Sequence, residues 1–533
     1  MKSENTIPIV IGVSGHRAIR EKDRPALSAA VKTELKKLQG RCRHSRLVLL
    51  CSLAEGADLL CADAAEELGV PLIAALPREQ ADYEKDFSEE GLAGLRRHIA
   101  RAEQVFVTPS TEPVPEGGAD RDFQFRQAGI YVAAHSHVLL ALWDGGPGTD
   151  SACGTAEAVD FALNGSYYPA EGVSLRSGCN EAVIHVFTPR GERTEEPAGT
   201  VHVLGNREAM LDVLKKTDDF NRQSASLKLE TASRLPQQTD DRLLARMETI
   251  SRAAGKLSGV NARRYRLALA LLALASALLT FAFLMYDEAQ AVWMILVCGF
   301  MLLAAWSCQR FAARSDCHRR YIEYRALAEC LRVQTYLRYA GSGLQAADLL
   351  SWTQQEETAW IMDALCALSA GERPMTGHDI RVCWVEAQRD YHREAGKRSQ
   401  SSLQLSERIV RTALFLSVGL YGAALLFELL CGGLIFAPRL PVNNVEIFRT
   451  ILKILLGTIS AVTLFVANYY GRLSLLRGLS DHGKMERFYG KMSDQLLRSG
   501  QTEALLTVLA REELIENGNW SSYQRDNKPD ISV

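Results

Sequence analysis

Two long stretches without a charged residue constrain this chain more than any other feature of its sequence. Residues 267–285 and 291–308 hold nineteen and eighteen uncharged, mostly apolar residues. Because about 20 apolar residues span the ~30 Å hydrocarbon layer of a bilayer, each stretch is long enough to cross it. A buried helix of a soluble protein would normally carry a polar stripe, and neither stretch has one. The sequence therefore predicts two transmembrane helices, joined as a hairpin.

A second pair of apolar segments, residues 413–437 and 451–470, predicts another transmembrane hairpin. Lys453 lies near a membrane end, where its long side chain can reach the interface. Glu428 lies deeper in its segment, and two interpretations stay open for it. It is either a carboxylate that reaches the outer interface or a pore-lining carboxylate that favours cations.

Arginines flank both hairpins at the ends away from their connecting loops. They are Arg263, Arg264, Arg266, Arg310 and Arg314 for the first hairpin and Arg408, Arg411, Arg472 and Arg477 for the second. Positively charged flanks generally stay in the cytoplasm. Arg439 and Arg449, in the second connecting loop, weaken this signal without reversing it. We therefore expect a multi-pass protein of the cell inner membrane with both termini in the cytoplasm.

Short apolar runs alternate with helical patterns through the first 205 residues. The predicted strands are residues 9–11, 47–50, 71–76, 104–107, 138–143 and 182–188, and the predicted helices are residues 25–38, 57–68, 89–102, 123–134 and 155–163. The strand runs are nearly all apolar, as parallel strands covered on both faces must be. Strands alternating with helices predict an α/β Rossmann-like domain with a doubly wound sheet.

Ligands of such sheets bind outside the carboxyl ends of the strands, and small or polar residues recur at these positions. The candidates follow the first strand (Gly12, Ser14, Gly15, His16 and Arg17), the second strand (Ser52, Glu55, Gly56 and Asp58) and the fifth strand (Trp143, Asp144, Gly154 and Thr155). We interpret the first group as a glycine-punctuated turn whose amides approach a phosphate. Because one nucleotide could contact all three turns, we predict a nucleotide-type ligand. Arg126 and Tyr131, on the helix before the fifth strand, are further candidates.

These turns resemble the SLOG superfamily of Rossmann-like domains, which includes the lonely-guy phosphoribohydrolases and the DNA-processing protein DprA. The resemblance covers roughly the first 190 residues, through residues 12–17, 52–58 and the Gly-Thr pair at 154–155. It implies a nucleotide pocket at these turns. The hydrolase members carry Pro-Gly-Gly-x-Gly-Thr-x-x-Glu, but Ala158 stands where their catalytic glutamate should be. Glu157 is one position away, which turns it by about 100° around the helix. The resemblance therefore implies the pocket without hydrolysis.

Two segments that flank the hairpins, residues 321–332 and 384–391, resemble the SLATT family. These are two-helix membrane domains found beside SLOG domains in prokaryotic defence loci, and they are thought to act as pore-forming effectors. Both segments are also compatible with amphipathic cytosolic helices that extend membrane helices. Whether the chain holds one composite module or two tandem modules stays open.

Composition excludes several other classes of function. The twelve cysteines show no CxxC spacing, which indicates reduced thiols and no zinc site. His16, His135, His137 and His185 are too dispersed to predict a metal site. With a net charge of −2 and no basic residues interleaved with aromatics in the head, nucleic-acid binding is not expected.

The chain is thus predicted to have six segments. They are a SLOG-like Rossmann nucleotide-binding domain (1–205), a helical coupling linker (206–262), a first transmembrane hairpin with a cytosolic SLATT-like helix (263–345), a cytosolic helical segment (346–410), a second transmembrane hairpin with a cytosolic helix (411–500) and a C-terminal tail (501–533).

The function that we predict is a nucleotide-gated membrane effector of a bacterial anti-phage, abortive-infection system, without enzymatic activity, cofactor or metal. The ligand would be a cyclic ADP-ribose-like molecule or a cyclic oligonucleotide, made by an enzyme encoded nearby. The amides of Gly12, Ser14 and Gly15 with Arg17 would bind one phosphate, and Gly154 with Thr155 a second. Glu55 and Asp58 would take ribose hydroxyls, and Trp143 would stack on a base.

Binding would cause the membrane helices of a homo-oligomer to open a pore or to disrupt the lipid bilayer. Two alternatives remain. One is a membrane-tethered nucleotide or NAD hydrolase that uses Glu55 or Glu157, and the other is a structural membrane anchor that recruits a partner.

Overall fold

A computed structural model of the chain forms two compact units. It describes residues 5–110, 120–146, 154–165, 167–168, 174–175, 182–190, 196–229, 235–236, 241–288, 292–372, 377–432, 442–471 and 475–526. The head unit comprises Met1–Leu257, Glu323–Ile380 and Gln501–Ser522, and the hairpin unit comprises Ser258–Ile322, Arg381–Gly500 and Tyr523–Val533.

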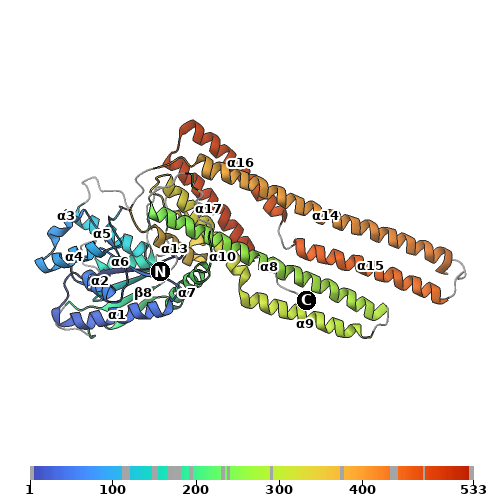
Figure 1. The fold of residues 1–533 in the computed structure, drawn as a ribbon, viewed down its shortest axis with the longest axis horizontal. Helices are drawn as coiled ribbons and strands as arrows, with labels where there is room; N and C mark the ends of the chain where they lie inside the picture. Colours follow the sequence, from blue (N-terminus) through green and yellow to red (C-terminus); the bar gives the residue numbers. More distant parts are fainter. Residues whose placement is uncertain are drawn as a thin grey trace. The chain divides into compact units, whose positions relative to one another are not determined.

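A seven-stranded sheet organises the head unit (Figure 1). Its strands are β1 (Ile9–Gly15), β2 (Leu47–Cys51), β3 (Leu72–Leu76), β4 (Gln104–Val107), β5 (Val138–Trp143), β8 (Ala182–Phe187) and β9 (Val201–Gly205). They lie in the order β4-β3-β2-β1-β5-β8-β9, all parallel except β9, which pairs antiparallel with β8. The predicted α/β fold with a parallel, doubly wound sheet is confirmed.

Helices cover both faces of this sheet because alternate strand residues point to opposite sides. They are α1 (Arg24–Arg41), α2 (Ala57–Glu67), α4 (Glu89–Arg101), α5 (Arg121–Ala134) and α6 (Thr155–Asn164). Ile9 and Ile11 of β1 share one hydrophobic cluster with α1, α2 and α4, whereas Val10 joins the cluster that contains α5 and α6. Each fully buried aliphatic side chain stabilises the fold by about 2 kcal/mol relative to exposure, so both layers are held firmly.

The predicted turn at residues 12–15 is wrong, because β1 continues through Gly15 and pairs with β5 along this stretch. The two glycines serve close packing instead. A Cβ atom on Gly12 would lie 2.7 Å from the Ser136 hydroxyl oxygen, and one on Gly15 would lie 2.4 Å from the Cβ atom of Ala57. Sequence analysis also missed β9 and the small hairpin of β6 (Tyr167–Tyr168) and β7 (Ser174–Leu175).

Helices complete the head unit. They are α7 (Arg207–Ser224), the first turns of α8 (Arg242–Glu288), most of α10 (Cys317–Tyr339), α11 (Ala346–Leu349), α12 (Trp352–Glu357), α13 (Ala359–Ser369) and α17 (Glu503–Asp526). The buried rings of Phe220, Tyr324 and Trp360 pack against one another between three of these helices. The predicted C-terminal tail contains α17, whose Glu513 accepts a hydrogen bond from Arg332 Nε of α10 at 3.1 Å.

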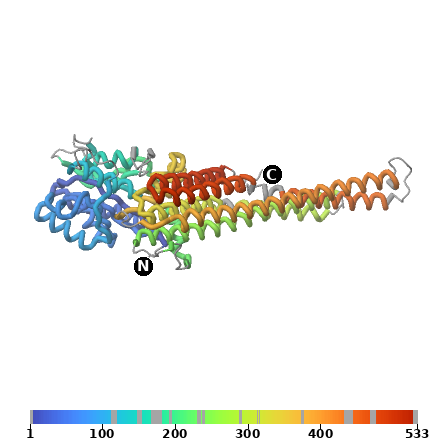
Figure 2. Tube along the Cα trace, turned by 90° about the horizontal axis from the view of Figure 1, so that it is seen from above, coloured from blue at the N-terminus to red at the C-terminus, as the bar shows by residue number. Residues whose placement is uncertain are grey.

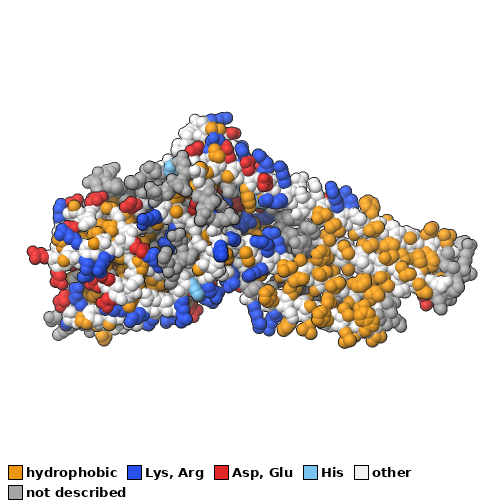
Figure 3. Space-filling view, viewed as in Figure 1, with side chains coloured by type: hydrophobic (Ala, Val, Ile, Leu, Met, Phe, Trp, Pro, Cys, Tyr) orange, Lys and Arg blue, Asp and Glu red, His pale blue; other side chains and the backbone are white. Residues whose placement is uncertain are grey.

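Four helices among the described residues are long and apolar enough to cross a membrane, which indicates a multi-pass membrane protein. The candidate spans are Arg242–Asp287, Met294–Phe311, Arg381–Leu430 and Asn444–Val466. They belong to α8, α9 (Met294–Ser315), α14 (Ala387–Phe427) and α15 (Val442–Gly471), and α16 (Leu475–Ser499) follows them. Hydrophobic side chains gather on the surface over these spans (Figure 3).

The second hairpin pairs its helices along their length, and α14 and α15 lie side by side in both views (Figures 1 and 2). At one end Arg449 donates two hydrogen bonds to the Glu428 carboxylate, at 2.6 and 2.7 Å. Glu428 is therefore paired with a cation, which neither of its two interpretations had included. Positions 150–153, Arg439, Arg472 and the final residues 527–533 lie outside the described residues.

Candidate functional site

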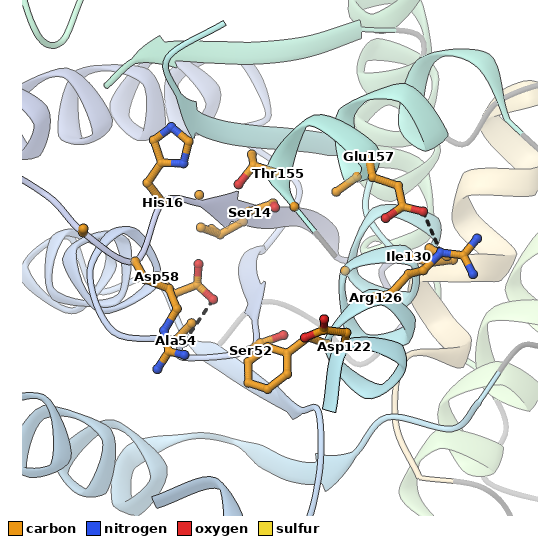
Figure 4. A pocket seen from close by; sticks show the side chains of 18 of the residues that line it. Ser14, His16, Ser52, Ala54, Asp58, Asp122, Arg126, Ile130, Thr155 and Glu157 are labelled. Atoms are coloured by element: carbon orange, nitrogen blue, oxygen red, sulfur yellow. Dashed lines mark hydrogen bonds and ion pairs between the residues drawn. The ribbon is translucent and has the colours of Figure 1, made fainter. Parts of the chain in front are cut away.

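A cavity of about 510 Å³ opens at the carboxyl ends of β1, β2 and β5 (Figure 4). The strand order reverses between β1 and β5, and ligands of doubly wound sheets bind at such a point. Nine predicted site residues line the cavity: Ser14, Gly15, His16, Arg17, Ser52, Asp58, Arg126, Gly154 and Thr155. The three loops that we selected from the sequence thus meet at one place. Its volume is in the range of small-molecule sites.

The loop after β1 is held against α2 by a glycine. Gly56 has a φ of +93°, which side-chain-bearing residues rarely adopt, and a Cβ atom there would lie 2.1 Å from the carbonyl oxygen of Arg17. This close approach allows the Ala57 N–H to donate to the carbonyl oxygen of His16 at 3.0 Å. Gly56 therefore shapes the cavity wall without lining it.

His16 is only 4% exposed and fixes the loops that follow β5 and β8. Its Nε2 accepts hydrogen bonds from the backbone N–H of Asp144 and from Arg190 Nε, both at 3.1 Å. Burial lowers the pKa of His16, and the neighbouring Arg190 guanidinium lowers it further. A neutral imidazole that accepts through Nε2 fits this environment, which makes His16 an organising residue of the cavity wall.

Asp58 is a buried carboxyl group in the cavity wall. Its Oδ2 accepts a hydrogen bond from the Ala54 N–H at 3.2 Å (Figure 4). Burial raises its pKa to about 7, while the backbone N–H groups of Ala54 and Ser52 and the charge of Arg17 act in the opposite direction. Near neutral pH this group is present in both protonation states, so it can donate or accept a hydrogen bond.

Two further parts of the cavity wall supply a guanidinium, that of Arg17, and the backbone amides at the start of α6. Arg17 donates from Nη2 to the carbonyl oxygen of Asp86 at 2.8 Å, which uses one of the five donors of a guanidinium. Across the cavity, Gly154 and Thr155 begin α6, and the N-terminus of a helix favours an anion. The pocket can therefore hold an anionic group between the end of β1 and the start of α6.

Arg126 of α5 is paired with Glu157 of α6, with a distance of 2.6 Å between Nε and Oε1 (Figure 4). The second carboxylate oxygen of Glu157 is buried and has no hydrogen-bond partner within the described part of the chain. This ion pair joins the two helices that form one side of the cavity.

Six predicted site residues do not line the cavity, and four of them have evident structural roles elsewhere. Gly12 packs against Ser136, and Glu55 accepts a hydrogen bond from the Ser88 hydroxyl on α4's N-cap. The Tyr131 hydroxyl accepts from the Gly371 N–H at 2.9 Å, and Trp143 Nε1 donates to the Gly146 carbonyl oxygen at 2.9 Å. The other two, Gly56 and Asp144, hold the loops around His16.

Sequence analysis missed several residues of the cavity. They are Val13, Ala18, Ala54, Arg121, Asp122, Phe125, Gly129, Ile130 and Arg190; Glu157 and Ala158 also line the cavity, and the sequence marks them only as the region of a hydrolase glutamate. Asp122 and Gly129 lie four and three positions from Arg126, so helical spacing would have placed them on the same face. Arg190 follows β8, and no local pattern marks it.

One cluster of side chains on α2 and α4 has the composition of a metal site. Potential ligand atoms of Asp63, Glu66 and His98 lie within 4.8 Å of one another. Arg97 pairs with Asp63, and Arg101 pairs with Glu66. The carboxylates are already neutralised by these guanidiniums, so the arrangement does not argue for an ion.

Comparison with known proteins identifies no family. A scan against protein-family models finds no matching model, and a search of curated proteins finds no matching protein.

Proposed function

We propose that this protein is a nucleotide-responsive membrane effector. The observation that carries the proposal is the cavity at the strand-order reversal. The same chain has candidate membrane spans, and the first of them is part of a helix that begins in the head unit. α8 runs as one helix from Arg242 in the head unit to Glu288 in the hairpin unit. A ligand that favours one arrangement of the head would thereby bias the membrane helices, because ligands shift only equilibria in which they prefer one state.

A nucleotide is the class of ligand that suits the cavity chemistry. The start of α6 offers backbone amides and the Thr155 hydroxyl to a phosphate. Arg17 adds a fixed positive charge, and ionised Asp58 can accept hydrogen bonds from ribose hydroxyls. Among nucleotides, we favour NAD-derived or cyclic second messengers, in line with the resemblance of residues 12–17, 52–58 and 154–155 to SLOG domains.

Contacts within the head unit offer a route from the cavity to α8. Helix α5 lines the cavity with Arg126, carries Tyr131 in its last turn and is followed by His135. His135 Nε2 lies 3.1 Å from the Gln345 amide, and the Tyr131 hydroxyl contacts Gly371. Further on, Arg338 of α10 donates to Asp241, which caps the first turn of α8, at 2.6 Å. A shift of α5 would therefore change the contacts at the start of α8.

The resemblance of the hairpin flanks to SLATT domains supports the finer proposal of an anti-phage effector. In this proposal the head is cytoplasmic, a nearby enzyme makes the signal, and a homo-oligomer permeabilises the inner membrane. Lipids would be the partners of the exposed side chains of α8, α9, α14 and α15.

Binding of ADP-ribose, cyclic ADP-ribose and cyclic dinucleotides to the full-length protein in detergent micelles tests the proposal by calorimetry. We expect at least one to bind, and Thr155→Val to weaken it by about five- to tenfold, because one hydrogen bond to a charged phosphate is lost. Thr33→Val, on the exposed face of α1, is the matched control and should bind like the wild type. Binding of none of these nucleotides would contradict the proposal.

One observation favours an alternative, a membrane-tethered nucleotide hydrolase. A carboxyl group with a pKa of about 7 inside a ligand-sized cavity has the properties of a general acid or base, and Asp58 is such a group. Glu157, which we had considered for this role, is engaged with Arg126. Chromatography of bound nucleotides after incubation separates the two functions, since an effector returns its ligand intact.

A further inference from the structure

We propose that Arg17, Arg78 and Arg121 form an anion site around Asp86, beside the nucleotide cavity, which binds the second phosphate of a two-phosphate nucleotide. This inference rests on the proposed function and specifies its ligand further.

A second cavity of about 490 Å³ lies at the carboxyl ends of β3 and β4, next to the first. Its wall includes Arg78, Thr108, Gln124 and Gln127, and Arg121 lines both cavities. An extended ligand that lies along the carboxyl edge of the sheet would therefore pass Arg121 on its way from one cavity to the other.

The three guanidiniums converge on one residue. The Asp86 carboxylate pairs with Arg78 through one oxygen and with Arg121 through the other, at 3.1 Å in the latter case. The carbonyl oxygen of the same Asp86 accepts the hydrogen bond from Arg17. The Phe125 ring lies between them, with the three guanidinium carbons 5.8, 6.0 and 5.4 Å from its centroid.

This cluster carries an excess of positive charge. The Asp86 carboxylate, with only 11% of its side chain exposed, pairs with two guanidiniums, and the third, that of Arg17, donates to the Asp86 carbonyl oxygen and interacts with the charge of Asp58. The nearby Asp82 is exposed and lies 2.6 Å from Lys85 Nζ, and Glu79 is exposed at the rim. In addition, Arg78 Nε is buried and has no acceptor within the described part of the chain. A buried donor without an acceptor, inside a cluster of excess positive charge, favours the binding of an anion.

Phosphate is the anion that suits these groups, because guanidiniums bind phosphate oxygens through two parallel hydrogen bonds. A mononucleotide in the first cavity places its single phosphate near the start of α6. A ligand with two phosphates, such as a pyrophosphate-linked or cyclic dinucleotide, would also reach Arg78. The site therefore selects for two-phosphate ligands over mononucleotides.

Arg78→Gln in the full-length protein tests this inference, because Arg78 lines the second cavity and not the first. Calorimetry would measure AMP, ADP-ribose and inorganic pyrophosphate. We expect ADP-ribose affinity to fall by about tenfold or more, AMP affinity to stay within about twofold, and pyrophosphate binding to be lost. Arg78→Lys, which keeps the charge beside Asp86 but not the fork, should give an intermediate loss for ADP-ribose. Arg101→Gln, an exposed arginine of α4, is the matched control and should change none of the three.

The outcomes separate this inference from the function on which it rests. Equal losses for AMP and ADP-ribose in Arg78→Gln would indicate a structural role for Arg78 and overturn the inference alone. So would unchanged ADP-ribose affinity, or a wild-type protein that does not bind pyrophosphate. A wild-type protein that binds no nucleotide at all would overturn the proposed function and this inference together.

Discussion

Asp58 is a carboxyl group that changes its protonation state close to neutral pH. Its pKa is raised from 3.8 to about 7, chiefly by burial. Between these values the folded head holds a proton that the unfolded chain has released. The free energy of unfolding therefore falls as pH rises from about 4 to about 7 and is level above that range.

Asp58→Asn removes this dependence, since the amide stays neutral at every pH while its oxygen still accepts from Ala54. We expect the variant to match the wild type near pH 5 and to exceed its unfolding free energy at pH 8 by up to about 3 kcal/mol. Denaturant unfolding of both proteins from pH 5 to pH 8 measures the difference. A difference that does not change with pH would contradict the assignment.

Some residues of the candidate site could be predicted from the sequence, and others could not. Ser52, Asp58 and Thr155 could be placed in one site because parallel strands bring their carboxyl ends to one edge. Gly12 and Gly15 could not be understood in the same way, because glycine marks a turn and a close packing contact equally well. Arg190 reaches His16 only because β8 lies beside β5, and no pattern near residue 190 predicts that neighbour.

Among the elements, α5 connects the cavity to the helical part of the head unit. Tyr131 is buried on this helix, and its hydroxyl both accepts from the Gly371 N–H and donates to the Gly371 carbonyl oxygen, at 2.9 and 3.3 Å. We had expected a ligand contact there, but the residue lies outside the cavity wall. Helix α5 thus has one face that lines the cavity and another that contacts the segment following α13.

Tyr131→Phe should leave nucleotide affinity unchanged but reduce unfolding free energy by about 1–2 kcal/mol, because the Gly371 N–H loses its buried acceptor. It should also weaken ligand-induced release from liposomes, if α5 transmits binding as proposed. Calorimetry and denaturant unfolding of the variant measure the first two effects. Affinity that falls as strongly as in Thr155→Val would instead place Tyr131 at the ligand.

Elements differ in how far the sequence determines them. The parallel strands β2 to β5 could be located to within a residue or two, because strands buried on both faces are continuous apolar runs. The edge strand β9 is half-exposed and mixed in composition, and so it was missed. Helix α17 was missed because its position depends on partners such as Arg332, 181 residues away from Glu513 in the chain.

For the whole molecule, the sequence shows that an α/β head and membrane spans occur in one chain more clearly than it shows how the head would act on the spans. The membrane spans follow from long uncharged runs, and the head follows from alternating strands and helices. Joint action depends on α8, a single helix that contributes its first turns to the head and its remainder to the hairpins. A nucleotide in the head can act on the bilayer only if it changes the free energy of one arrangement of this helix relative to another.

Release of an entrapped dye from liposomes that contain the purified protein tests this central claim most directly. The nucleotide that binds best by calorimetry would be added while its integrity is followed by chromatography. We expect dye release with the nucleotide intact, and this release should be reduced in Thr155→Val and unchanged in Thr33→Val. Nucleotide breakdown without release would contradict it in favour of a tethered hydrolase, and tight binding without either effect would leave only a membrane anchor.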